Sequence, residues 1–270
     1  MKKEKIIFKC GQKGFVFQDI VKTIKKSGIK KGDVAMVHAD LSKFGKLGDI
    51  VDKTEFANVF IEAFLKTIGK GGTLIVPTFT YSFCNNEIYD PDNTPSTVGL
   101  FTEELRKRKD AYRSIHPIFS VAAIGKRAEE LTSNLSKNSF GKGSIYDKLA
   151  NIRDSKYIIF GVDYFVCTQI HYIEEKIGVS YRYTKKFKGK IKIKNKVYND
   201  EYEYYVRPLD ESAIPDFSKI EKNLLDSGLL KKLPLGCAKI SVAIIGDICR
   251  EGIKMFKNDP TCFIKTNTKI

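Results

Sequence analysis

The stretch DKTEFANVFIEAFLKTIGKGGTLIVP (52–77) decides the fold of this 270-residue chain. Apolar residues recur in its first part at positions i, i+3, i+4, i+7 and i+8, namely Phe56, Val59, Phe60, Ala63 and Phe64. This spacing predicts an amphipathic helix over 52–69. The apolar run GTLIVP (72–77) then predicts a buried strand. A helix that leads directly into a buried strand indicates a fold in which the two alternate.

The same alternation continues on both sides of this stretch. Residues 16–28 predict a helix, and DVAMVH (33–38) predicts the strand that follows it. Further strands are predicted at SVAAIG (120–125) and KYIIFGV (156–162), each followed by a candidate helix. The fold class is therefore α/β, with layers around a largely parallel central sheet.

The C-terminal half changes character. Residues 181–206 alternate lysine with isoleucine or aromatic residues around NKVYND, which predicts a β-hairpin excursion. Residues 216–228 and 239–256 predict two closing helices. Neither a linker nor an internal repeat divides the sequence, so we expect residues 1–270 to form a single domain.

Composition and charge limit the class of protein. Hydrophobic residues make up 42% and charged residues 29% of the chain, as in globular domains. The net charge is +15, from 47 lysines and arginines against 32 acids, which favours anionic partners. Lysine, isoleucine and asparagine are abundant together, a bias that AT-rich coding alone can produce. The charge comes without a zinc-finger, RNP-type or helix-turn-helix signature, so nucleic acid is not the expected partner.

The N-terminal residues and the cysteines indicate a cytoplasmic protein without a membrane partner. The sequence has no apolar run long enough for a signal peptide or a membrane span. Six cysteines lie far apart, with no CxxC pair: Cys10, Cys84, Cys167, Cys237, Cys249 and Cys262. We expect reduced, mostly buried thiols and no bound metal.

The segment CTQIHYIEE (167–175) contains one of the three histidines of the chain. On a helix that begins near Thr168, His171 lies one turn from both Glu174 and Glu175. A carboxylate beside an imidazole fixes its tautomer and raises its pKa, which suits a general base near neutral pH. The spacing leaves open which glutamate serves, and whether the pair is only a solvated ion pair on a surface helix. Because a predicted strand precedes this helix, its position favours function.

Three other features are candidates for chemistry. In α/β sheets ligands bind at the carboxyl ends of strands, so the loop VHADLSKFGKLG (37–48) offers backbone N–H groups to an anion or oxyanion. In YRSIHPIFSVAAIG (112–125), His116 precedes a proline and Arg113 is a candidate phosphate contact. Cys167 is a candidate nucleophile, although a small buried residue is the commoner role for such a cysteine.

Several segments, taken in order, resemble the aminoglycoside 3-N-acetyltransferase family along nearly the whole chain. They are KKGDVAMVHADLSKFG, GGTLIVPTFTYSF, YDPDNTPSTVGLFTEELR, YRSIHPIFSVAAIGKRAEEL, IIFGVDYFVCTQIHYIEE and DFSKIEKNLLDSGLL. The most specific patterns are RSxHPxxSxxAxG (113–125) and TxxHxxE (168–174). The sequence has no G-x-S-x-G elbow, Walker loop or G-x-G-x-x-G, which would have indicated other enzyme classes.

The resemblance implies an acyl-coenzyme A dependent N-acyltransferase with a three-layer α/β/α sandwich on a mixed sheet. It implies that His171 is the catalytic base, that Glu174 orients it, and that Thr168 faces the thioester. The residues it assigns to the cofactor lie in the loop after the first strand and around the third strand: His38, Ala39, Asp40, Leu41, Ser42, Thr78, Arg113, Ser114, His116, Ser120, Val121 and Ala122. Acetyl-CoA or another acyl-CoA is the implied co-substrate, and the sequence leaves a homodimer open.

The sequence departs from the family pattern at two places. Ala39 and Asp40 stand where the family has serines, and Ile145 stands where it often has proline. We expect direct transfer in a ternary complex, in which backbone N–H groups of residues 39–42, together with Thr168, stabilise the oxyanion.

The acceptor is expected to be an amino sugar, either an aminoglycoside-type antibiotic or a nucleotide-linked sugar. The strongly basic chain favours the second mildly. The alternatives to this reaction are a nucleic-acid-binding protein on an inactive scaffold and an acyl-enzyme formed on Cys167.

Overall fold

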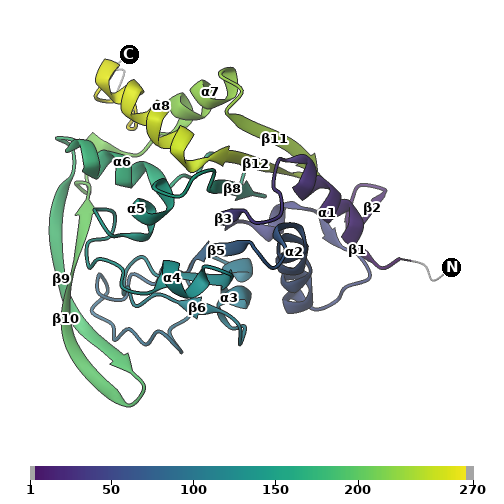
Figure 1. Cartoon of the computed structure of the whole chain (residues 1–270), viewed down its shortest axis with the longest axis horizontal. Coiled ribbons are helices and arrows are strands. Elements are labelled where there is room, and N and C mark those ends of the chain that lie inside the picture. The colour runs from purple at the N-terminus through teal and green to yellow at the C-terminus, as the bar shows by residue number, and fades with distance from the viewer. Residues whose placement is uncertain (1–3, 266–270) are drawn as a thin grey trace.

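The computed structural model describes residues 4–265, and within them seven strands form the central sheet, in the order β11-β12-β8-β3-β5-β7-β6 (Figure 1). Their bounds are β3 (Val34–Ala39), β5 (Thr73–Pro77), β6 (Tyr112–Arg113), β7 (Val121–Gly125), β8 (Lys156–Phe160), β11 (Leu230–Leu235) and β12 (Ala238–Ile244). The mixed α/β sheet is confirmed. It is less parallel than expected, because β3 pairs in parallel with β5 and β8 while the outer pairings are antiparallel.

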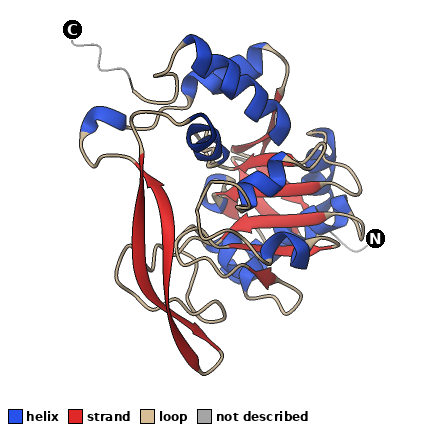
Figure 2. Ribbon diagram, turned by 60° about the vertical axis from the view of Figure 1, so that its left-hand side comes forward, coloured by secondary structure: helices blue, strands red, loops and turns tan. Residues whose placement is uncertain are grey.

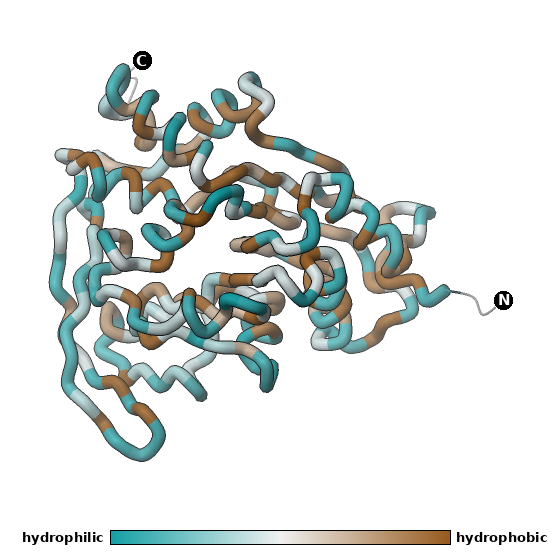
Figure 3. Tube along the Cα trace, in the orientation of Figure 1, coloured by the Kyte–Doolittle hydropathy of each residue, from teal (hydrophilic) through white to brown (hydrophobic). Residues whose placement is uncertain are grey.

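Helices cover both faces of this sheet, which confirms the three-layer sandwich. The first face carries α1 (Phe17–Lys26), α2 (Lys53–Ile68) and α3 (Leu100–Arg106). The second carries α4 (Ala128–Thr132), α5 (Ile145–Ala150), α6 (Gln169–Ile177), α7 (Ser218–Asp226) and α8 (Ile245–Asn258). Alternate residues of β3 join the two cores, with Ala35 and Val37 on one side and Val34 and Met36 on the other. The apolar stretches of the trace follow the central strands (Figure 3).

The hairpin expected at 181–206 is confirmed as β9 (Tyr183–Ile193) and β10 (Lys196–Val206). It forms its own two-stranded sheet and extends away from the sandwich (Figure 2). One side of it packs on the body of the protein through Ile191 and Tyr202, both buried. The lysines of β9 are mostly exposed.

The prediction of a helix over 239–256 is wrong in its first part. Ala238–Ile244 is strand β12, which pairs antiparallel with β8 and with β11, and helix α8 begins only at Ile245. The apolar run is compatible with either structure in isolation. Here the turn at Gly236, with its positive φ of 64°, sends the chain back along β11 and makes it a strand.

A second small sheet and a disulfide bond also differ from expectation. Strands β1 (Ile6–Cys10), β2 (Lys13–Val16) and β4 (Lys46–Leu47) form this sheet beside α1 and α2. Cys10 at the end of β1 is bonded to Cys237 in the β11–β12 turn, so the prediction of reduced thiols is wrong for this pair. Their separation of 227 residues gives no signal in the sequence. Cys84, Cys167, Cys249 and Cys262 are free thiols.

No helix in the described part of the chain is long and apolar enough to cross a membrane. The prediction of one domain over 1–270 remains a prediction, and residues 1–3 and 266–270 lie outside the described range.

Candidate active site

His171 and Glu174 form a close pair on helix α6, which follows β8 as expected. The Nδ1 atom of His171 lies 2.6 Å from Glu174 Oε2. Ile170 and Ile173, which neighbour this pair on the helix, are fully buried and fix its rotation. Glu175 turns away and accepts a hydrogen bond from Asn138 at 2.6 Å. The structure therefore distinguishes the two glutamates that the spacing left open.

Glu174 is fully buried, and two hydrogen-bond partners and one ion-pair partner surround its carboxylate. Besides His171, the Tyr181 hydroxyl donates to Oε1 at 3.1 Å and Arg182 Nε lies 2.7 Å from Oε2. A buried carboxylate requires such compensation. The roles of Tyr181 and Arg182 could not be predicted from the sequence, because both residues lie beyond the helix, where no periodic pattern connects them to Glu174.

The His171 ring lies between two aromatic rings and is largely shielded from water. Its centroid is 5.1 Å from that of Phe140 and 5.8 Å from that of Phe217. Burial lowers the pKa of His171, and Arg182 adds to this effect, while Glu174 acts in the opposite direction. The expected rise in pKa is therefore wrong in its net sign, because burial outweighs the carboxylate. The imidazole is neutral near neutral pH.

A cavity of about 1000 Å³ opens at the carboxyl ends of the central strands. It is lined by the loop after β3, by residues 97–100 and by the turn before α6. Among the predicted residues, those that line it are His38, Ala39, Asp40, Leu41, Ser42 and Thr168. Thr168 belongs to the helical turn before His171, so the cavity begins next to the base, although the His171 ring is not among the described lining residues.

Polar groups in the loop after β3 form hydrogen bonds within the protein. The Asp40 carboxylate accepts hydrogen bonds from the backbone N–H of Ser42 at 3.0 Å and from its hydroxyl at 2.6 Å. The N–H of Asp40 donates to the Phe160 carbonyl at 2.9 Å. The expectation that the backbone N–H groups of 39–42 are free oxyanion donors is therefore wrong for Asp40 and Ser42. Asp40 stands where the family pattern has serine. Its carboxylate therefore accepts hydrogen bonds that the sequence predicted for a bound anion.

His38 and His116 are buried, and burial lowers the pKa of each to about 3. His38 stacks on Tyr157, with ring centroids 5.1 Å apart. His116 Nδ1 accepts from the N–H groups of Ile118 and Phe119 at 3.3 and 3.0 Å, and so shapes its own turn. Both rings stay neutral, and His116 lies away from the cavity lining.

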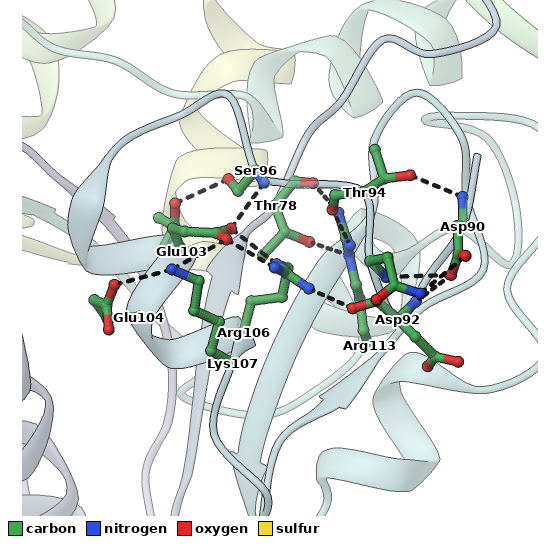
Figure 4. Close-up of polar contacts among 12 residues, drawn as sticks. Thr78, Asp90, Asp92, Thr94, Ser96, Glu103, Glu104, Arg106, Lys107 and Arg113 are labelled. Atoms are coloured by element: carbon green, nitrogen blue, oxygen red, sulfur yellow. Dashed lines mark hydrogen bonds and ion pairs between the residues drawn. The ribbon is translucent and has the colours of Figure 1, made fainter. Parts of the chain in front are cut away.

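Arg113 ties loops together rather than facing the cavity. Its guanidinium donates to the carbonyls of Pro91 at 2.9 Å, Thr94 at 2.6 Å and Thr78 at 3.1 Å (Figure 4). Four other residues assigned to the cofactor are fully buried around β7: Ser114, Ser120, Val121 and Ala122. A cofactor contact for these residues and for Thr78 remains a prediction. The hydrogen bonds of the Arg113 guanidinium all go to groups of the protein itself.

Cys167 is fully buried, and this burial raises the pKa of its thiol well above the usual value. A protonated, enclosed thiol is a poor nucleophile, which argues against an acyl-enzyme on Cys167. In residues 4–265, His, Cys, Asp and Glu side chains do not gather in groups of three that could hold a metal ion.

A sequence model of one family, described as aminoglycoside 3-N-acetyltransferase, matches residues 36–257. The chain belongs to this family. It is 24% identical over 253 residues to aminoglycoside N(3)-acetyltransferase IV from Salmonella sp, a match that covers 91% of this chain and 89% of the relative. The chain is accordingly an acyltransferase. Within the family match lie His171, Glu174 and the cavity lining.

Solved structures of family members share the fold. AAC-IIIb, in a binary complex with CoASH, superposes with a TM-score of 0.78 at 20% identity, covering 93% of this chain and 98% of that one. AAC-VIa bound to sisomicin gives a TM-score of 0.78 at 20% identity, covering 90% and 98%. At 20% sequence identity, this likeness shows a shared fold and nothing finer.

Proposed function

We propose that this acetyltransferase moves the acetyl group of acetyl-CoA to an amine of an aminoglycoside-type amino sugar, with His171 as general base. The observation that carries this proposal is the 2.6 Å contact between His171 and the fully buried Glu174, beside a cavity at the strand ends. The CoASH and sisomicin complexes of the two related structures support the choice of co-substrate and acceptor.

The pair has the arrangement that a base needs. The Glu174 carboxylate accepts a hydrogen bond from the Nδ1–H of the neutral ring, so Nε2 carries the free lone pair. The acceptor nitrogen gives a proton to Nε2 as it forms a bond to the thioester carbonyl carbon. The C–S bond then breaks, and the proton passes from the imidazolium to the departing thiolate. Glu174 stabilises the imidazolium between these events.

Thr168 is the proposed donor to the developing oxyanion. Its backbone N–H already donates to the Tyr157 hydroxyl at 2.8 Å, so the role falls to its side-chain hydroxyl. Thr168 lines the cavity one turn from His171. A donor aimed at charge that develops in the transition state accelerates the reaction without reorganisation.

The cavity fits an acyl-CoA in size and chemistry. Its volume of about 1000 Å³ is at the upper end of the usual range for ligand pockets. Apolar side chains such as Phe79, Val98 and Leu100 line it, as suits a long pantetheine arm. Lys43 and Lys53 stand at the same cavity and supply positive charge for phosphates. We assign these residues to the co-substrate in addition to the loop 38–42.

A nucleotide-linked amino sugar is the second candidate acceptor. The net charge of +15 and the exposed lysines of β9 favour an anionic acceptor over a polycation. The cavity itself is balanced, because Asp40 and Asp163 line it together with two lysines.

The experiment is a thiol-release assay on the full chain with acetyl-CoA and either sisomicin or a nucleotide-linked amino sugar. Release with sisomicin supports the first acceptor, and release only with the nucleotide-linked sugar assigns the second. Release with neither contradicts the proposed function. His171→Ala is expected to lower kcat by about 10²- to 10⁴-fold. Near-normal turnover in that variant would show that the base is elsewhere.

A further inference from the structure

We propose that Arg182 is a positioning residue of this active site. Its guanidinium holds the Glu174 carboxylate against His171 and opposes protonation of the imidazole, which would add a second positive charge to the site. The inference rests on the proposed role of His171 as base. It concerns a residue outside helix α6, in the short connection between α6 and β9.

The three side chains meet at a single atom. Oε2 of Glu174 lies 2.7 Å from Arg182 Nε and 2.6 Å from His171 Nδ1. The Arg182 side chain is only 2% exposed, and Glu174 is fully buried. At this distance the enclosed guanidinium and carboxylate form an ion pair, although the Nε–H is not aligned for a hydrogen bond to Oε2, so the attraction between the two charges holds them together. The carboxylate oxygen that orients the base is thus itself held by the arginine.

The root of the β9–β10 hairpin holds Arg182 in place. Arg182 Nη1 donates to the Tyr205 carbonyl on β10 at 3.3 Å. The Tyr205 hydroxyl in turn donates to the Val179 carbonyl, just after α6, at 2.8 Å. The last pair of the ladder, Tyr183 with Val206, closes the hairpin beside it. A segment that looks like a surface excursion therefore supplies and anchors a side chain of the active site.

The charges around Glu174 give Arg182 a second effect. With a neutral imidazole, the guanidinium and carboxylate charges cancel, and protonation of His171 leaves a net positive charge in a buried site. Without Arg182, the negative charge of Glu174 is no longer balanced by the guanidinium. It then stabilises the protonated form of the imidazole and raises the pKa of His171. Arg182 therefore keeps the resting base neutral and holds its pKa below the usual range, together with burial.

The other groups that face this carboxylate are uncharged near neutral pH. Burial raises the pKa of Tyr181, Tyr204 and Tyr205, and raises that of Cys262 to about 11. Phe140 and Phe217, which contact the His171 ring, carry no charge. The arginine is therefore the charged partner whose removal changes the balance.

The test measures the pKa of His171 directly, by NMR titration of the imidazole signals. The chain has three histidines, and the two others have pKa values of about 3, so His171 should give the one signal that titrates at higher pH. In Arg182→Gln we expect its pKa to rise by about one unit or more. The acid limb of the kcat profile should move by the same amount, and the plateau at higher pH should lie below that of the native chain because the carboxylate is no longer held, while the KM values stay unchanged.

Two variants serve as controls. Arg207→Gln removes a positive charge from the same end of the hairpin, where Arg207 bonds to the Pro208 and Asp210 carbonyls, and it should leave the His171 titration unchanged. Arg182→Lys keeps the charge, so its pH profile should stay near that of the native protein even if its different geometry lowers kcat. If Arg182→Gln does not fold, Arg182→Lys tests the positioning role alone, and a native kcat in that variant would overturn it.

An unchanged or lowered His171 pKa in Arg182→Gln would overturn the inference, and so would a kcat reduced equally at every pH. These outcomes are separate from failure of the proposed function. If the pKa rises as expected while His171→Ala remains active, Arg182 controls the imidazole but the imidazole is not the base.

Discussion

The Nδ1 atom of His171 and the Oε2 atom of Glu174 lie 2.6 Å apart, one helical turn from each other and on the buried side of α6. This contact favours the tautomer with the proton on Nδ1, which leaves Nε2 as the nitrogen that would act as the proposed base.

Activity should depend on pH with an acid limb at lower pH than for a free imidazole. A general base works only when unprotonated, so kcat/KM rises with pH through the pKa of His171 and then levels off. Because burial and Arg182 lower this pKa, the midpoint should fall below the ordinary value of about 6.5. A pH–rate profile of the native chain checks this. A midpoint above the ordinary value would contradict the electrostatic description of the site.

Glu174→Gln should lower both the stability and the turnover of the protein, whereas Glu175→Gln should change either one only slightly. The first variant removes the partner of a buried arginine, and loss of one member of a buried pair lowers the free energy of unfolding by about 3–5 kcal/mol. It should also lower kcat, because the amide orients the ring poorly and does not stabilise an imidazolium. Glu175 bonds to Asn138 instead and is the matched control on the same helix. Urea unfolding and turnover of the two variants decide the matter, and equal effects would count against the pair.

Acid should destabilise the fold through His38 and His116. Their pKa values are about 3 when folded, so between the ordinary imidazole value and about 3 the unfolded chain binds protons that the folded chain does not. Stability is therefore lost as pH falls through this window, by about 1.4 kcal/mol per pH unit for each ring. Urea unfolding at several pH values measures the slope. His116→Asn, which keeps an acceptor for the turn, should give a shallower one, and an identical slope would argue against a buried neutral ring.

Reductant should destabilise the native chain. A disulfide typically stabilises a folded protein by about 2–4 kcal/mol. Cys10→Ser combined with Cys237→Ser should lower the melting temperature to that of the reduced native protein, and reductant should then have no further effect. Cys84→Ser, which removes a free thiol, is the control and should keep the dependence on reductant. A native protein indifferent to reductant would mean that the bond does not contribute to stability.

Cys167→Ser should keep its activity. Because Cys167 is fully buried and burial raises the pKa of its thiol, we expect it to take no part in the transfer. Intact-mass measurement after mixing the native chain with acetyl-CoA should find no acyl adduct. An adduct of one acetyl group that disappears in the serine variant would revive the acyl-enzyme.

The elements best predicted from the sequence are those whose apolar residues follow one clear pattern. The helix over 52–69 has a clear apolar stripe and is observed at Lys53–Ile68, and the strands at 72–77 and 156–162 are short apolar runs bounded by turns. Ala238–Ile244 was mistaken for a helix because its apolar run suits both structures and the pairing with β8 decides between them. The N-terminal sheet was missed for a similar reason, since β1, β2 and β4 are short and are stabilised by one another.

The candidate site divides in the same way. The local pair of His171 and a glutamate follows from helical spacing, but the choice of Glu174 depends on side-chain directions. Arg182 could not be found from spacing, because its contact with Glu174 depends on the root of the hairpin. The use of the Ser42 N–H by Asp40 likewise depends on the local turn, and it changes what the loop offers to a ligand.

The bond between Cys10 and Cys237 turns most of the polypeptide into a covalent ring, since 227 positions separate the two residues. A protease that cuts one exposed loop inside this ring, such as the hairpin tip near Lys194, leaves two fragments that cannot separate. On a denaturing gel the nicked protein should run as one species until a thiol is added, and only then as two.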